Sequence, residues 1–282
     1  SNSNNKKIIN NILFTNFNNQ WFANTLANKN LKINELKFPS ALDVTDKNQN
    51  KYSISNYFYD SETFKNVNKI LFNDENYEIG MSWFGIESFA NCNILDEEIN
   101  FNYLEDIDNK YGNFVLFRNN SFYNTNIKRL NISISSSNLE LDSYSFSNNK
   151  NLNDFNISCS NDVNSWFYLS NYLLSDCNNL TSFNLISNNL LLSSYLFKGA
   201  NKLNSININT NKLFGLSEFV FANDYDSFNL KLLFKASDGD FDSNSFSNIN
   251  VNIEKFNMEV SKNPSIKYPG LTEEQKNKII YI

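Results

Sequence analysis

The chain has 282 residues, of which 41% are hydrophobic and 15% aromatic, and its formal net charge is −6. This hydrophobic content is enough to build a core and argues against a disordered chain, while the negative charge argues against a nucleic-acid partner, which would require a basic face. The sequence has no histidine, which excludes Ser-His-Asp and Cys-His catalytic arrangements and histidine-ligated metals. No apolar run is long enough to cross a bilayer.

Residues 1–30 are expected to comprise a tag remnant and an N-terminal cap. The chain opens with Ser-Asn-Ser instead of Met, as a cleaved purification tag would leave it, so an export signal or anchor of the natural protein can lie outside these residues. The segment around Trp21 and Phe22, IINNILFTNFNNQWFANTL, is predicted to be helical and to cover the first repeat.

Residues 31–258 carry an internal repeat. In the three clearest copies, which start at Leu141, Leu169 and Leu192, an apolar residue is followed by Tyr at +3, an apolar residue at +5, Leu at +11, and apolar residues at +14 and +16. These six anchors are expected to be buried. Looser copies extend toward both ends, and successive copies start about 24 residues apart, within the range of leucine-rich repeats.

The closing half of each copy, L-x-x-[FI]-x-[IL], predicts a short strand, because its last two apolar residues are two positions apart and face the same side. Asparagine follows this strand at Asn188 and Asn211, where its amide would bond the backbone of a turn. One copy buries too little apolar surface to fold alone, so the copies must stack. The sequence therefore predicts one continuous core without an internal domain boundary.

Residues 259–282 are predicted to cap the C-terminal end. The sequence TEEQ from Thr272 has the form of a capping box that leads into a short helix, KNKIIYI. The apolar side chains of Ile279, Ile280 and Ile282 are expected to cover the last coil.

The copies SYSFSNNKNLNDFNI, NYLLSDCNNLTSFNL and SYLFKGANKLNSINI resemble the BspA-like (Treponema-type) leucine-rich repeats of bacterial and protozoan surface proteins, with Cys177 at that family's cysteine position. The customary proline after the strand is seen only at Pro39, and the alanine before Phe is replaced. The resemblance covers residues 117–232 closely. It implies a right-handed leucine-rich-repeat solenoid with a short-stranded parallel sheet on the concave face, an irregular convex side and short terminal caps.

The candidate binding residues are outward-facing positions on consecutive strands and one aromatic residue in an insertion. The asparagine series would form a hydrogen-bonding concave face; the alternative is a solvated strand face in an asparagine-rich chain. Arg129 and Asp154 are expected to pair, and Trp166 is a hot-spot candidate if exposed, or else a ring packed on the next coil. The candidates are Asn131, Asn156, Asn184, Asn207, Arg129, Asp154 and Trp166.

No metal or cofactor is expected. Residues 238–244 space oxygen ligands as a calcium loop does, but Ser243 stands where an EF-hand requires Gly and Ile249 where it requires Glu, so a plain acidic turn is favoured. Cys92 and Cys177 are expected to fill space as buried thiols.

The resemblance implies an extracellular cell-surface protein, often lipid-anchored, that mediates adhesion or protein binding. The leading expectation is a monomeric binding protein, not an enzyme, whose partner is a host or extracellular-matrix protein or glycan. The alternative is a structural or antigenic surface-coat protein without a single fixed ligand. A third reading, a carbohydrate-active enzyme with a groove on the solenoid, requires a clustered pair of carboxylates.

Overall fold

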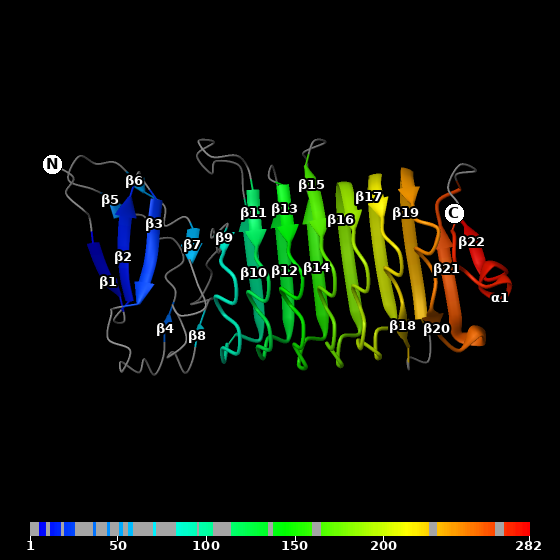
Figure 1. Cartoon of the computed structure of the whole chain (residues 1–282), viewed down its shortest axis with the longest axis horizontal. Helices are drawn as coiled ribbons and strands as arrows, with labels where there is room; N and C mark the ends of the chain where they lie inside the picture. Colours follow the sequence, from blue (N-terminus) through cyan, green and yellow to red (C-terminus); the bar gives the residue numbers. More distant parts are fainter. Residues whose placement is uncertain are drawn as a thin grey trace.

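The protein is a parallel β-solenoid of about six turns with almost no helix. Its coils lie side by side in chain order along the molecule (Figure 1). The repeat solenoid that the sequence predicts is thus confirmed at the level of architecture. The computed structural model describes some N-terminal strands before residue 83, and after it residues 83–94, 96–103, 114–134, 138–159, 165–225, 230–262 and 268–282.

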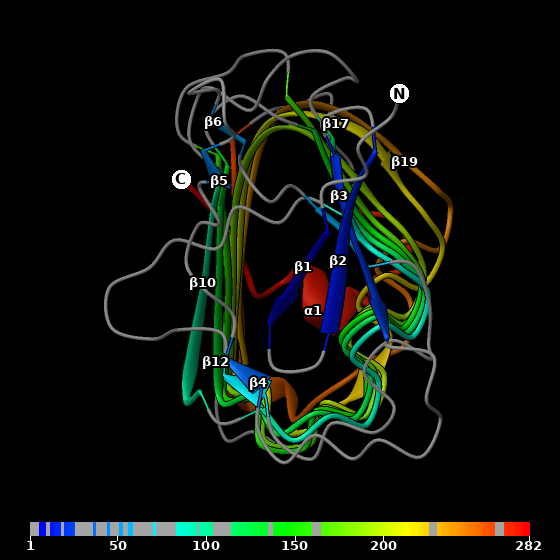
Figure 2. The same cartoon turned by 90° about the vertical axis from the view of Figure 1, so that its left-hand side faces the viewer.

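Each closing half forms a strand of what we call the first wall. Burial alternates along these strands, and the predicted anchors Phe155 and Ile157 point into the core. The first wall is nearly flat when the coils are viewed end-on (Figure 2). Its strands are β10 (Glu98–Tyr103), β12 (Arg129–Ile134), β14 (Asp154–Cys159), the first halves of β16 (Ser182–Leu192), β17 (Ser205–Leu216) and β19 (Leu230–Phe241), β21 (Phe256–Val260) and β22 (Ile279–Tyr281).

The opening part of each coil forms a second wall of parallel strands, where the sequence analysis expected irregular structure. The buried residues of β13, Leu139 and Leu141, alternate with half-buried ones, a period of two that the single anchor at Leu141 did not reveal. The second wall comprises β9 (Trp83–Phe84), β11 (Phe114–Phe117), β13 (Asn138–Leu141), β15 (Trp166–Leu169) and the second halves of β16, β17 and β19.

Asn188 and Asn211 lie inside β16 and β17, which run on from one wall to the other. They are therefore not in a turn, contrary to the prediction, because the chain stays extended where the repeat pattern places its corner. The Asn211 amide donates to the side chain of Asn188 at 2.6 Å. These continuous strands join both walls into one 16-stranded sheet within the described part of the chain.

Consecutive tight turns close each coil on its third side. The N–H groups of Ser145 and Ser147 bond carbonyls three residues back, both at 3.1 Å. Those of Tyr144 and Phe146 instead donate to carbonyls of the next coil, at 3.2 and 3.3 Å. Hydrogen bonds between coils therefore continue around the turn side as well as along both walls.

The tyrosine at +3 is not a core anchor, so this part of the burial prediction is wrong. Tyr144, Tyr172, Tyr195 and Phe219 have positive φ of 56–60°, and their rings stack at centroid distances of 5.1, 5.2 and 5.5 Å. Tyr144 is exposed and the other three are half-buried. A bulky residue in the left-handed region costs on the order of 1 kcal/mol, which ring stacking and inter-coil hydrogen bonds offset.

A single core extends from Phe84 to Leu271 through the described coils, as predicted. Like side chains repeat from coil to coil: the Phe122 and Phe146 rings stack at 5.3 Å. The predicted boundary at 258/259 lies within β21, which pairs with β19 on one side and β22 on the other.

The predicted N-terminal helix is wrong. The segment forms β1 (Lys6–Ile9), β2 (Ile12–Phe17) and β3 (Gln20–Thr25), which pair antiparallel, and β3 continues into the sheet through β7 (Asn56–Phe58). Its β-branched and aromatic residues favour strand over helix. The short remaining elements are β4 (Leu36–Lys37), β5 (Val44–Thr45), β6 (Lys51–Tyr52), β8 (Ile70–Leu71), β18 (Asn223–Asp224), β20 (Ile249–Asn250) and the 3₁₀ helix Ile253–Lys255.

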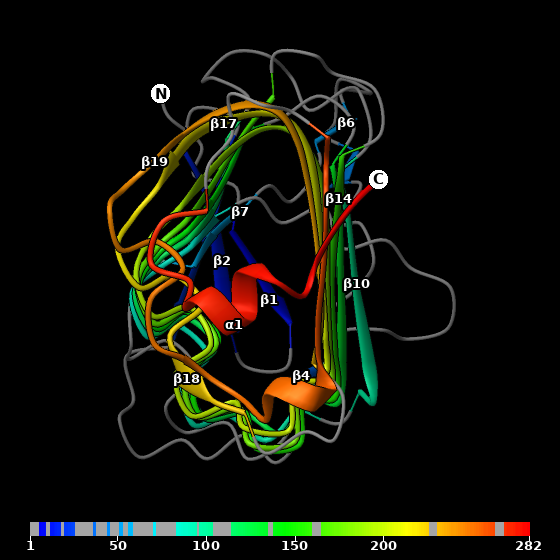
Figure 3. The same cartoon turned by 90° about the vertical axis from the view of Figure 1, so that its right-hand side faces the viewer.

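The predicted capping box at the C-terminal end is confirmed. The Gln275 N–H donates to the Thr272 hydroxyl at 3.1 Å, and the Thr272 N–H donates to the Gln275 side chain at 3.0 Å. Helix α1 (Glu273–Lys276) lies across the end of the coils (Figure 3). The predicted helix KNKIIYI is wrong beyond Lys276, where α1 ends, because Ile279–Tyr281 pair with β21 as β22. Ile279 packs on the core, but Ile280 and Ile282 are exposed, contrary to the expectation that all three cover the last coil.

Truncation of a core ring should destabilise the whole stack. Phe183 is fully buried between Phe155 (5.8 Å) and Phe197 (5.0 Å), so Phe183→Ala is expected to lower the free energy of unfolding by about 3–5 kcal/mol. Ile186→Ala, on the same strand but with its side chain 48% exposed, should change it by about 0.5 kcal/mol or less. Urea unfolding followed by circular dichroism measures both; equal losses would contradict the described packing.

Candidate functional site

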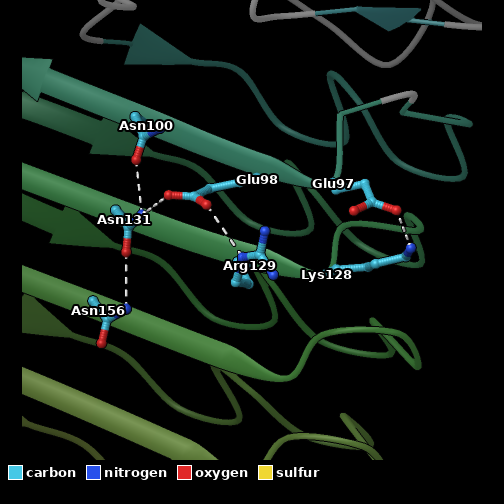
Figure 4. Close-up of polar contacts among 7 residues, drawn as sticks. All are labelled: Glu97, Glu98, Asn100, Lys128, Arg129, Asn131 and Asn156. Carbon is cyan, nitrogen blue, oxygen red and sulfur yellow. Dashed lines mark hydrogen bonds and ion pairs between the residues drawn. The ribbon is translucent and has the colours of Figure 1, made fainter.

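The asparagine series forms a side-chain ladder on the outer face of the first wall. The Asn131 amide donates to Asn100 at 2.7 Å and the Asn156 amide to Asn131 at 2.8 Å (Figure 4). The Asn184 amide donates to Asn156, again at 2.8 Å. Strand register places these residues directly opposite one another. The sequence analysis missed Asn100, which precedes the anchor Phe101 as the others precede theirs.

The hydrogen-bonded ladder runs to Asn184, and Asn207 on the next coil continues the row of amides. This residue lies opposite Asn184 on one side and opposite Leu233 on the other. A leucine side chain has no donor, and the covered Oδ1 atom of Asn207 has no hydrogen-bond partner. Leu233 therefore interrupts the row of amides and leaves the Asn207 oxygen without a donor, an effect that substitution of Leu233 can test.

The charged candidates on the first wall do not pair as predicted. The Arg129 guanidinium lies 3.2 Å from Glu98 on the preceding coil, and Glu98 also accepts from Asn131 at 2.8 Å. Asp154 accepts from the Ser182 hydroxyl. No ion pair between Arg129 and Asp154 occurs among the described residues, because the coil before Arg129 offers a longer carboxylate side chain.

A second ion pair, Lys128 with Glu97, lies beside the first (Figure 4). The hydrogen bond and the charge of Lys128 hold the pKa of the Glu97 carboxyl below its usual value. Both side chains are well exposed, so the pair contributes little to stability. On this wall, side-chain amides bond to amides and basic side chains pair with carboxylates of the neighbouring coil. Such contacts between adjacent strands favour the observed register of the coils.

The outer face of the second wall carries the exposed aromatic candidate. Trp166, at the start of β15, is 42% exposed. Its ring stacks on Phe214 of β17, with centroids 3.8 Å apart and planes inclined by 26°, so the two rings meet across β16. The Lys212 ammonium lies 4.4 Å from the centre of the Phe214 ring. Trp166 therefore packs on a surface ring two coils away and keeps much of its indole in solvent.

A β-bulge places Phe214 on this face. Leu190 pairs with Leu213 but Leu191 pairs with Gly215, so Phe214 is the additional residue in β17. Bulges redirect side chains and are frequent beside functional sites. The sequence reads KLFGL at this point, and the Phe-Gly pair inside a strand is the signal that sequence reasoning overlooked.

Gly215 leaves a notch in the row of outward side chains beside Phe214. Its φ lies outside the left-handed region, and among the described residues an added Cβ would meet Leu191, at 3.8 and 3.9 Å, an ordinary contact distance. Gly215 thus does not adopt a left-handed conformation, and it directly follows the additional residue of the bulge. On the other side of Leu191 in the same row lies Tyr168, whose hydroxyl accepts from Ser170 and Ser193, each at 3.4 Å.

Two carboxyl groups do come together on the second-wall side. Burial, followed by the charge and hydrogen bond of Asp142, raises the pKa of Glu140, and Arg118 lies 3.3 Å from Asp142. A direct hydrogen bond leaves no room for a scissile bond or water, whereas glycosidase carboxyls stand about 5–10 Å apart. The Glu140–Asp142 pair therefore lacks the geometry that the glycosidase reading requires.

The thiols and the acidic stretch are structural. Cys92 and Cys177 are buried as predicted, and burial raises the pKa of each to about 12, which keeps both thiols protonated. Residues 238–241 belong to β19, so the first part of the predicted acidic turn is extended strand. In the described residues no three Cys, Asp or Glu side chains gather to hold a metal ion.

No protein-family profile, no curated protein and no solved structure matches this chain. Within the part that the structure describes, no helix is long and apolar enough to span a membrane.

An additional asparagine in the ladder should increase the free energy of unfolding. In Leu233→Asn the new amide can donate to the unpartnered Asn207 oxygen, so this variant should be more stable than Leu233→Ala by about 1 kcal/mol. The alanine variant controls for the lost leucine contacts. Urea unfolding of the two variants provides the comparison, and an asparagine variant no more stable than the alanine variant would count against the ladder as a stabilising element.

Proposed function

We propose that this chain is a BspA-like leucine-rich-repeat protein of the cell surface that binds a host or matrix macromolecule through the outer face of its second wall. The repeat spacing of about 24 residues, the strand motif L-x-x-[FI]-x-[IL] and the buried Cys177 at the family's cysteine position support the family assignment. In this proposal, family membership implies an extracellular location at the cell surface.

The observation that carries the proposal is the Trp166–Phe214 stack. Both rings lie outside the continuous core, so neither is needed to fill it. A large aromatic residue that remains 42% exposed on a sheet is the type of side chain that dominates binding energy at interfaces. The bulge in β17 has the effect of bringing a second ring beside it.

The asparagine ladder has a different role in this proposal. Each amide of Asn131, Asn156 and Asn184 donates a hydrogen bond to the asparagine of the preceding coil. Their amides are committed to the scaffold, and the first wall supports the coils while the second wall presents the aromatic patch.

A binding screen of the purified chain against arrayed matrix proteins, glycans and host-cell surfaces tests this function. Trp166→Ala is expected to weaken a saturable interaction at least tenfold, because loss of an aromatic hot spot costs about 2 kcal/mol or more. The matched control, Asn156→Ala with Asn184→Ala, alters the opposite wall and should leave affinity unchanged.

A different result would redirect the interpretation. An interaction lost in the asparagine variant but retained in Trp166→Ala would place the binding face on the first wall. The absence of any saturable partner would contradict the proposal and favour a surface-coat protein whose repeats serve display.

A further inference from the structure

We infer that the aromatic patch of the second wall is a binding site for a neutral glycan, with a sugar ring seated in the notch at Gly215 beside the Trp166–Phe214 stack. We define the patch as Trp166, Tyr168, Leu191, Phe214 and Gly215, contributed by three successive coils. The inference rests on the function proposed above and names the chemical class of the partner.

Gly215 is the observation that points to a ligand independently of the exposed tryptophan. Side chains occupy the equivalent outward positions of the two preceding coils, Leu191 and Tyr168. Glycine interrupts this row although its backbone is not left-handed and, among the described residues, a Cβ would meet Leu191 only at ordinary contact distance. A glycine inside a strand accompanies bulges and places where another molecule approaches the backbone, and at Gly215 no side chain covers the backbone directly after the bulge.

The aromatic stack beside the notch suits one side of a sugar ring. Phe214 fixes the orientation of Trp166 at a centroid distance of 3.8 Å, and the remaining indole surface faces solvent. The negative face of an aromatic ring attracts the partially positive C–H groups of an apolar sugar face. A pre-oriented ring also avoids the entropy cost of ordering on binding.

Hydrogen-bonding groups border the patch where sugar hydroxyls would lie. The Tyr168 hydroxyl accepts from two serines, which leaves its own proton as a donor. Glu140 lies opposite Tyr168 on the preceding coil and is half-buried. Because the Glu140 carboxyl is hydrogen-bonded to Asp142, Tyr168 is the group of this row that can donate to a sugar hydroxyl.

Charge and size favour a neutral glycan over other ligands. Lys212 is the charged side chain next to the stack, and its ammonium lies over the Phe214 ring, so the patch has no cluster of cations for an anionic ligand. Three coils and two residues along a strand span about 10 Å by about 7 Å. This area fits one or two sugar rings and is roughly a tenth of the about 800 Å² that each partner buries in a stable protein interface.

Calorimetric titration of the intact chain tests the inference, with a panel of linear neutral oligosaccharides that covers glucose, galactose, mannose and N-acetylhexosamine units. At least one should bind with a Kd below about 1 mM. Gly215→Leu, which fills the notch, and Trp166→Ala should each weaken that binding at least tenfold. Melting temperatures of the variants establish that both remain folded, and Asn156→Ala on the other wall is the control with unchanged affinity.

A panel without any binder, or binding that Gly215→Leu leaves unchanged, would overturn the inference. Saturable, Trp166-dependent binding to an enzymatically deglycosylated protein, together with a blank oligosaccharide panel, would overturn the glycan assignment and leave the proposed function standing. Absence of saturable binding both to the oligosaccharides and to any protein would overturn the glycan inference and the proposed function together.

Discussion

Hydrogen bonding between successive coils is the constraint on which the rest of the structure depends. It holds along the first wall, along the second wall and around the turns, where the Tyr144 and Phe146 N–H groups donate to the following coil. Coils bonded to their neighbours along both walls and at the turns place residues of the regular strands over their counterparts. Aromatic rings therefore stack on aromatic rings and amides on amides. The sequence repeats because equivalent positions of successive coils lie in register.

The sequence predicted what the repeat encodes directly. Parallel strands, one core and the inward direction of Phe155 and Ile157 follow from apolar spacing, because buried positions must recur in every coil. The second wall was missed since its strands show only two inward residues each, too few to establish a period of two. The tyrosines shared the spacing of core anchors, and only the positive φ of the turn directs them outward.

The candidate site was partly predictable for a related reason. Trp166 could be singled out because it was assigned to an insertion that lengthens the repeat, and insertions often carry binding residues. The structure instead places Trp166 at the start of the regular strand β15. Its partner Phe214 lies two coils away and reaches it through a bulge, which no periodic pattern encodes. The asparagines were conspicuous for the opposite reason: they recur at the same position of consecutive coils, where Asn131, Asn156 and Asn184 bond their neighbours. We propose that this regular wall is the scaffold and that the irregular second wall is the binding surface.

Amide hydrogen exchange at Tyr144 and Phe146 tests most directly whether the coils are bonded on all sides. These two amides lie in turns that would be solvated in an ordinary loop, but here they donate to the carbonyls of Asn171 and Leu173. The described fold predicts protection comparable to that of Phe155 in the first wall, since opening either requires separation of two coils. Exchange of the turn amides at the rate of an exposed loop, with Phe155 protected, would contradict hydrogen bonding between coils on the turn side.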